Sequence, residues 1–262
     1  MTQSVLVDRQ DHVLTITLND PEARNPITGE QTIAEVTDAL STANDDVDVR
    51  CVVLTGKGKA FSGGGNIKDI RAGRLPFGGP PIASAEGYRT GIQTLAKALR
   101  SCEVPTIAAI NGPAVGAGFD ITMMCDLRIA SKNATFAESF VRLGLVPGDG
   151  GAWLLPRTIG AHRAAQMLFT GQTVTADQAL AWGLVGEVVE PDELIATATA
   201  LATSIAKNPP RAVRMAKRLL REGEHQSFDS ALELAALAQA IAHSTSDHRT
   251  AVAPDESTYV GE

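Results

Sequence analysis

Cysteine is scarce in this chain, and its cysteines lie far apart. Only three occur among 262 residues, at Cys51, Cys102 and Cys125. Neither a CxxC pair nor a pair of closely spaced histidines accompanies them, so the sequence has neither the spacing of a zinc site nor a disulfide framework. We therefore expect buried free thiols in a reducing, cytoplasmic compartment and no metal site.

Long apolar runs and a targeting segment are also missing. The N-terminal residues, MTQSVLVDRQD, are too polar for a signal peptide. No apolar run approaches the roughly 20 residues that are needed to cross a bilayer. The sequence therefore predicts a protein without membrane association.

Positive charge is in deficit, and nucleotide-binding fingerprints are absent. Lys and Arg number 23 against 30 Asp and Glu, a net charge of -7, whereas a nucleic-acid groove needs clustered Lys and Arg. The glycines of 112–118 have the wrong spacing for a dinucleotide fingerprint, and residues 56–62 lack the Gly-Lys-Ser/Thr ending of a P-loop. These absences argue against nucleic-acid binding and nucleotide hydrolysis, but they leave room for one basic pocket that binds a phosphorylated ligand.

Apolar periodicity predicts alternating strands and helices in the first two-thirds of the chain. The expected strands are Ser4–Val7 and His12–Leu18, which form a hairpin, then Val49–Thr55, Thr106–Ile110, Leu127–Ala130 and Ala134–Ala137. The expected helices are Gln31–Ala43, Ile67–Arg71, Ala85–Ser101, a helix that starts near Phe119, and Ala152–Ile159. This alternation predicts an α/β core around a largely parallel sheet.

The last third of the chain is predicted to be nearly all helical. The expected helices are Ala161–Thr170, Ala176–Trp182, Glu193–Ala206, Arg211–Glu222 and Phe228–His243, with one strand-like segment at Glu187–Val189. We place the α/β core at residues 1–200 and the C-terminal helical region at residues 201–262. The Pro/Gly-rich segment Arg74–Ala83 is interpreted either as a mobile loop near a ligand or as a disordered insertion.

Two glycine-rich loops each follow a predicted strand and each open a helix. They are Ser62–Asn66 and Gly112–Gly118. Free N–H groups gather at a helix start, where the helix dipole adds positive potential. Two such loops can therefore direct two N–H groups at one oxygen atom, which is the geometry of an oxyanion hole. Asp120 falls in the first turn of the second helix, where it is either a carboxylate beside an anion site or a simple helix cap.

The order of several motifs along the chain resembles that of the crotonase (enoyl-CoA hydratase/isomerase) family. The motifs are KAFSGGGNIK at 59–68, INGPAVGAGFD at 110–120 and LGLVPGDGGAWLLPR at 143–157, followed by Phe169–Gly171 and Ala176–Gly183. The resemblance implies a crotonase-like spiral of ββα units with a helical C-terminal trimerisation region, assembled as a homotrimer or as a hexamer (a dimer of trimers). It also implies an acyl-CoA thioester ligand, with coenzyme A as part of the substrate and no separate cofactor.

The resemblance also assigns the binding residues. The N–H groups of Gly65 and Ala117 would hold the thioester carbonyl oxygen. The family's CoA-binding segments match Ala23, Arg24, Asn66, Ile67 and Lys68. Arg24 would pair with a CoA phosphate and Lys68 would lie near the adenine; an exposed loop arginine and a solvated lysine at a helix start are the alternative interpretation.

The sequence departs from the hydratase pattern at the two glutamates that jointly hold the attacking water. The first position carries Asp120, and the second carries Phe140, which can neither accept nor deliver a proton. We expect Asp149, in the glycine loop PGDGG, to act with Asp120 as an acid/base pair, because two carboxylates in a small apolar site push their pKa values apart. The alternatives are that Asp149 is a turn residue, and that Glu138, which we interpret as a surface or interface residue, is the second acid.

The predicted function is that of an acyl-CoA enzyme that stabilises a thioester enolate, which is an enoyl-CoA hydratase or isomerase. We expect it to act in the catabolism of fatty acids or other acyl-CoA compounds. Two alternatives stay open. One is an isomerase or hydrolase of a different CoA thioester, because Phe140 replaces an acid, and the other is a CoA-binding scaffold without catalysis. The helix that starts at His248 is broken by the residues PDES at 254–257, which leaves open whether the C-terminus reaches the CoA of a neighbouring subunit.

Overall fold

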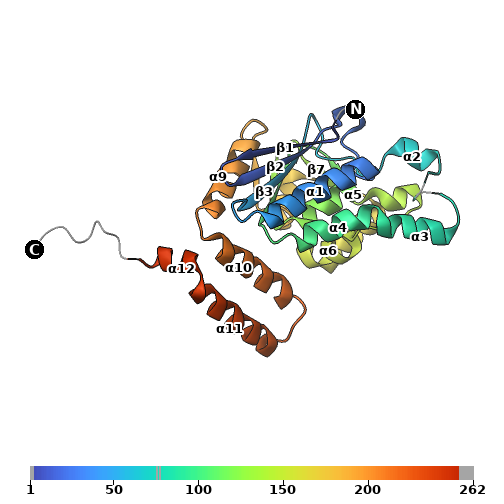
Figure 1. The fold of residues 1–262 in the computed structure, drawn as a ribbon. Helices are drawn as coiled ribbons and strands as arrows, with labels where there is room; N and C mark the ends of the chain where they lie inside the picture. Colours follow the sequence, from blue (N-terminus) through green and yellow to red (C-terminus); the bar gives the residue numbers. More distant parts are fainter. Residues whose placement is uncertain (1–2, 75, 77, 254–262) are drawn as a thin grey trace, which may run out of the picture.

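A six-stranded sheet forms the centre of the molecule (Figure 1). The computed structural model describes residues 3–74, 76 and 78–253. The strands lie side by side in the order β1 (Val5–Gln10), β2 (Val13–Leu18), β3 (Cys51–Gly56), β4 (Thr106–Ile110), β6 (Leu127–Ser131) and β9 (Glu187–Val189). β1 and β2 form the predicted antiparallel hairpin, and every other pairing in this sheet is parallel. The prediction of a largely parallel sheet is confirmed.

A smaller sheet packs beside the first and consists of β5 (Ala114–Val115), β7 (Thr135–Ala137) and β8 (Thr173–Thr175). β7 was predicted as a strand, but its place outside the main sheet was not. β5 and β8 were missed, because runs of two or three residues are too short to show a period of two. Their register is set instead by partners that are distant in sequence, such as Ala114 opposite Phe136.

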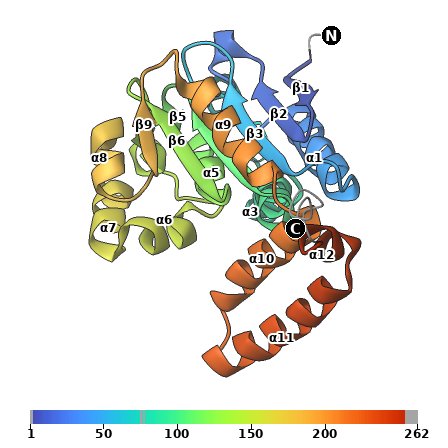
Figure 2. The same cartoon turned by 90° about the vertical axis from the view of Figure 1, so that its left-hand side faces the viewer.

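Helices cover both faces of the main sheet, as parallel strands require. They are α1 (Glu30–Asp45), α2 (Ile67–Arg71), α3 (Pro81–Thr90), α4 (Ile92–Ser101), α5 (Ala117–Met124), α6 (Gly151–Ile159), α7 (Ala161–Thr170), α8 (Ala176–Ala181), α9 (Leu194–Ala206), α10 (Pro210–Gly223), α11 (Phe228–Ser244) and α12 (Ser246–Ala251). Short 3-10 helices lie at Pro21–Ala23 and Ser139–Leu143. The larger apolar core lies between the sheet and α1, α4 and α5, and α9 covers the opposite face over β2, β3, β4 and β6 (Figure 2).

The single helix predicted at Ala85–Ser101 is wrong. The chain forms α3 and α4, which meet at Gly91, where ψ is -116° and a Cβ atom would lie 2.6 Å from the carbonyl oxygen of Gly87. The predicted loop Arg74–Ala83 is also too long, because α3 begins at Pro81, where proline has no amide hydrogen to lose. Residues 75 and 77 of that loop lie outside the described residues.

The last helices extend away from the core (Figures 1 and 2). α9 spans residue 200, where we placed the boundary between the α/β core and the C-terminal helical region, and it packs on the sheet. The division of the chain into these two regions stays a prediction. All residues of α11 are exposed or half-buried, including apolar side chains at Phe228, Leu232, Leu237 and Ile241. No helix among the described residues is long and apolar enough to span a bilayer.

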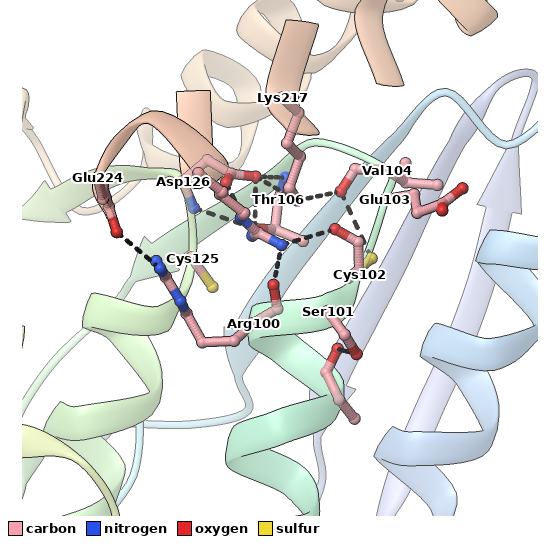
Figure 3. A network of polar contacts seen from close by, with 12 residues as sticks. Arg100, Ser101, Cys102, Glu103, Val104, Thr106, Cys125, Asp126, Lys217 and Glu224 are labelled. Carbon is pink, nitrogen blue, oxygen red and sulfur yellow. Dashed lines mark hydrogen bonds and ion pairs between the residues drawn. The ribbon is translucent and has the colours of Figure 1, made fainter. Parts of the chain in front are cut away.

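Helix α10 is joined to the core by the cationic side chains of Lys217 and Arg221 (Figure 3). Lys217 Nζ lies 2.6 Å from Asp126 Oδ2 and donates to the carbonyl oxygen of Val104, while Arg221 contacts the other oxygen of Asp126 at 3.0 Å. Asp126 also accepts hydrogen bonds from the backbone N–H and the hydroxyl of Thr106. Since Thr106 begins β4, this network ties the C-terminal helices to a central strand.

Candidate active site

A small cavity of about 110 Å³ lies between the two glycine-rich loops, α3 and the segment that leads into α6. Most of its lining is apolar: Ile67, Ile70, Pro76, Ile92, Val115, Phe140, Leu143 and Leu145 contribute to it. The polar groups that reach it include the backbone of Gly65 and Ala117 and the side chains of Tyr88 and Asp149. A mostly apolar cavity with a few converging polar groups is the usual form of a small-molecule site.

The two glycine-rich loops touch at positions that only glycine can occupy. Gly64 has φ +78°, and a Cβ atom there would lie 2.4 Å from the carbonyl oxygen of Val115 and 3.1 Å from the nitrogen of Ala117. A Cβ atom at Gly118 would lie 2.5 Å from the carbonyl oxygen of Ser62. The glycines thus let two backbones approach to contact distance, and this approach places Gly65 and Ala117 at one cavity.

The N–H groups of Gly65 and Ala117 are available to a ligand. Within the described residues neither donates to a protein acceptor, whereas the N–H groups of Phe119 and Asp120 are held by the carbonyl oxygen of Gly116. Ala117 is the first residue of α5, so its N–H lies at the positive end of the helix dipole. Two free donors on one cavity can bind an oxygen atom that carries negative charge.

The predicted CoA-binding segments lie side by side at this cavity. The N–H of Gly63 donates to the carbonyl oxygen of Arg24 at 2.7 Å, and the N–H of Ile27 donates to that of Gly64 at 2.9 Å. Arg24 itself has φ +63° at the end of a 3-10 helix that includes Ala23. Arg24 and Lys68 are exposed, Asn66 caps α2 through its side chain, and Ile67 lines the cavity.

Three carboxyl side chains form a buried cluster behind the cavity. Asp120 and Glu138 are 0% exposed and Asp149 is 4% exposed. Asp120 lies next to both of the others, because the carboxyls of Glu138 and Asp149 both act on its pKa. The N–H of Gly151, at the start of α6, donates to Asp120 Oδ2 at 3.2 Å. The sequence prediction that Asp120 and Asp149 lie close together therefore agrees with the geometry, although their catalytic roles stay a prediction.

The interpretation of Glu138 as a surface or interface residue is wrong. Glu138 follows β7 with φ -88° and ψ 71°, which is not extended backbone. The alternation of a strand therefore ends here, and a sequence pattern cannot show to which side the carboxyl points. The side chain turns into the cluster, while Phe140 lines the cavity with its ring 3.4 Å from the position of a Cβ atom at Gly116.

Burial raises the pKa of all three carboxyls. It is the largest cause in each case, and it raises the pKa of Glu138 to about 7 and that of Asp149 to about 8. The pKa of Asp120 is also raised well above its ordinary value, first by burial and then by the charge of Glu138. A buried carboxylate without a cation is unfavourable, so the cluster retains protons at neutral pH.

Only one of these carboxyls reaches the cavity. Among the described residues that line it, Asp149 is the single acidic side chain, and Asp120 lies behind it. Tyr88, from α3, lies beside Asp149: burial, and next the charge of Asp149, raise the pKa of its phenol. Tyr88 was not predicted as a site residue, because its position in an ordinary helical pattern carries no signal.

Gly151→Ala tests the packing of this cluster. A Cβ atom at Gly151 would lie 2.3 Å from both Asp120 Oδ1 and Glu138 Oε1, so we expect a loss of about 1–3 kcal/mol in the free energy of unfolding, as for other overpacked sites. Urea titration measures it. The control is Gly223→Ala, which meets nothing within 4 Å and should be neutral or stabilising by up to about 1 kcal/mol. Equal stability of Gly151→Ala and wild type would contradict this packing.

Fold and site together define an α/β protein with a small, mostly apolar cavity that two free N–H groups and one buried carboxyl side chain reach. Comparison with known proteins identifies the class. The sequence model described as enoyl-CoA hydratase/isomerase matches residues 8–253. The chain belongs to the enoyl-CoA hydratase/isomerase family, has the crotonase fold, and is an acyl-CoA enzyme.

Individual relatives include both hydratases and an isomerase. The short-chain-enoyl-CoA hydratase of Clostridium acetobutylicum is 36% identical over 252 residues, covering 95% of this chain and 93% of the relative. The 1,2-epoxyphenylacetyl-CoA isomerase of Escherichia coli is 33% identical over 255 residues, with 96% and 95% covered. The crystal structure of an enoyl-CoA hydratase from Bacillus anthracis is similar with a TM-score of 0.87 at 33% identity, covering 94% of this chain and 93% of that one.

Proposed function

We propose that this enzyme isomerises an enoyl-CoA thioester by moving a proton, with Asp149 as the acid/base group and the N–H groups of Gly65 and Ala117 as the oxyanion hole. The observation that carries the proposal is that Asp149 is the one acidic side chain among the described residues that lines the cavity. A double-bond shift needs a single group that removes a proton from one carbon and returns it to another. Hydration needs a second group to hold the water.

The reaction would proceed through an enolate. The thioester oxygen accepts hydrogen bonds from the N–H groups of Gly65 and Ala117, and Asp149 removes a proton from C2 of a β,γ-enoyl thioester. The electron pair of that C–H bond moves into the dienolate, whose oxygen carries the charge at the oxyanion hole. Asp149 then delivers the proton to C4, and the double bond comes to lie between C2 and C3. Removal of one such oxyanion donor costs roughly 3–4 kcal/mol in other enzymes.

The lining of the cavity supports isomerisation over hydration. Phe140 stands where the hydratase pattern has its second glutamate, and its ring lies at the cavity beside Gly116. An aromatic ring there cannot hold a water molecule by hydrogen bonds. Hydration is the second candidate, because several relatives are named as hydratases.

The remainder of the substrate would lie along the two linked loops. We propose that Arg24 pairs with a CoA phosphate and that Lys68 lies near the adenine, with Ala23, Asn66 and Ile67 beside them; Arg24 and Lys68 are both exposed at the edge of the cavity loops. The reaction needs no cofactor besides the CoA of its substrate. It would serve fatty acid or other acyl-CoA catabolism in the cytoplasm.

The exposed apolar residues of α11 support a homotrimer or a dimer of trimers. Leu237 and Ile241 are 64% and 59% exposed. A protein that stayed monomeric would leave this apolar surface in water. We propose that neighbouring subunits cover it.

The test is a comparison of two thioesters. We expect a β,γ-enoyl-CoA to be converted to the conjugated thioester, with a rise in its ultraviolet absorbance, and crotonyl-CoA to lose its absorbance far more slowly. Faster hydration of crotonyl-CoA would identify a hydratase instead. Release of free CoA from β-keto or other thioesters would identify a hydrolase, and tight binding of acyl-CoA without turnover of any of them would identify a scaffold.

A further inference from the structure

We propose that Glu138 is a positioning residue of this site: with Asp120 it forms a buried carboxyl relay that accepts and returns the proton handled by Asp149. The inference rests on the role proposed above for Asp149. It extends the site to two carboxyls that the substrate does not touch.

The geometry forms a chain that leads inward from the cavity. Asp149 lines the cavity, Asp120 lies beside Asp149, and Glu138 lies beside Asp120. A Cβ atom at Gly151 would contact both Asp120 Oδ1 and Glu138 Oε1, so these two oxygens lie close together. Among the described residues, no N–H or O–H group donates to either carboxyl oxygen of Glu138. A fully buried carboxyl in such a place is satisfied only if protons are shared between it and its carboxyl neighbour.

Among the residues that the structure describes, no cation forms an ion pair with any of the three carboxyls. The groups that shift the pKa values of the three carboxyls are the carboxyls themselves and the N–H groups of Gly148, Asp149 and Gly151. From α3, Tyr88 faces Asp149. Three adjacent carboxylates without a counter-charge cannot all ionise in a buried site. Near neutral pH the cluster therefore carries at most about one negative charge, and the protons on it belong to the cluster as a whole.

These protons can move along the chain while the total charge of the protein and the substrate stays the same. Starting with the charge on Glu138, the substrate proton binds to the cavity-facing oxygen of Asp149. The proton of Asp149 passes to Asp120, and that of Asp120 passes to Glu138. Each O–H bond that breaks is replaced by another, and the negative charge ends on the substrate enolate. The reverse sequence returns the proton to the product.

Glu138→Gln tests the relay, because its amide has nearly the same shape but cannot take up a proton. A carboxyl acts as a base only when it is ionised, so kcat falls as the pH drops through the pKa of the group that carries the charge. We expect the acidic limb of kcat for isomerisation near pH 7 in wild type and near pH 8 in Glu138→Gln, where Asp149 must ionise itself. At pH values below both limbs the variant should be about tenfold slower, with KM unchanged.

Matched variants separate this role from simple packing. Glu138→Asp keeps a proton-accepting group and should retain the wild-type limb. Glu187→Gln, at an exposed position of β9, should leave the profile unchanged. An unshifted limb in Glu138→Gln would overturn the proposal, as would a limb shifted to lower pH, since either would mean that Glu138 does not carry the charge of the cluster.

Infrared difference spectroscopy tests the relay without turnover. Wild type at pH 7 should show the C=O stretch of buried, protonated carboxyls, and part of this band should titrate near pH 7 and be lost in Glu138→Gln. Absence of any protonated carboxyl band in wild type would overturn the relay even if Glu138→Gln did not fold. An enzyme that shows the band but does not isomerise enoyl thioesters would refute the proposed function and leave the shared protons standing.

Discussion

Asp149→Asn is expected to lower kcat for the isomerisation of a β,γ-enoyl-CoA by about 100- to 10,000-fold, the usual contribution of a general acid/base. KM should change little, because the carbonyl oxygen and the CoA are bound by other groups. The amide keeps the shape of a side chain that is 4% exposed, so the effect is chemical rather than structural. Steady-state rates from the absorbance of the conjugated product measure it.

Two controls make this result specific. Asp229→Asn changes an exposed aspartate at the start of α11 and should leave kcat unchanged. Asp120→Asn removes a carboxyl that does not line the cavity and should slow the reaction less than Asp149→Asn. If Asp149→Asn kept wild-type activity, or if Asp120→Asn had the larger effect, Asp149 would not be the group that meets the substrate.

Asp126→Asn is expected to reduce the free energy of unfolding by about 3–5 kcal/mol, the range for a buried ion pair that loses one partner. The side chain of Lys217 is 6% exposed and that of Asp126 is 20% exposed. Burial lowers the pKa of Lys217 and the charge of Asp126 opposes that shift. Without the carboxylate, a buried ammonium group remains with mainly the carbonyl of Val104 to stabilise it (Figure 3).

The destabilisation by Asp126→Asn should depend on pH, and the pKa of Lys217 determines the direction of that dependence. The pKa of Lys217 is lower in the folded than in the unfolded chain, so the unfolded state binds more protons and stability rises with pH as Lys217 loses its charge. The loss caused by Asp126→Asn should therefore shrink at alkaline pH. Urea unfolding measures it. Glu190→Gln, which breaks an exposed pair with Lys132, should cost no more than about 1 kcal/mol. An equal loss in the two variants would contradict the stabilising role of the Lys217–Asp126 ion pair.

The comparison of sequence and structure shows which kinds of feature a local pattern can reveal. The buried strands β3 and β4 and the amphipathic α1 were predicted within a few residues. The continuous apolar runs of the strands and the helical apolar period of α1 each extend over five or more positions. The motifs around Gly65 and Ala117 were found for a related reason, since close approach of two backbones demands glycine at particular positions. The strands β5 and β8 are too short to carry such a signal.

The carboxyl cluster could not be predicted from a local sequence pattern. The sequence determined the order of the longer strands and most helices, the two glycine-rich loops and the replacement of a glutamate by Phe140. Only the tertiary structure decided that Glu138 is buried beside Asp120 and that Asp149 alone of the three reaches the cavity. The physical reason is that Glu138 follows a strand at a non-extended ψ of 71°. A side chain at such a bend takes its direction from the elements packed around it, and these come from distant parts of the chain.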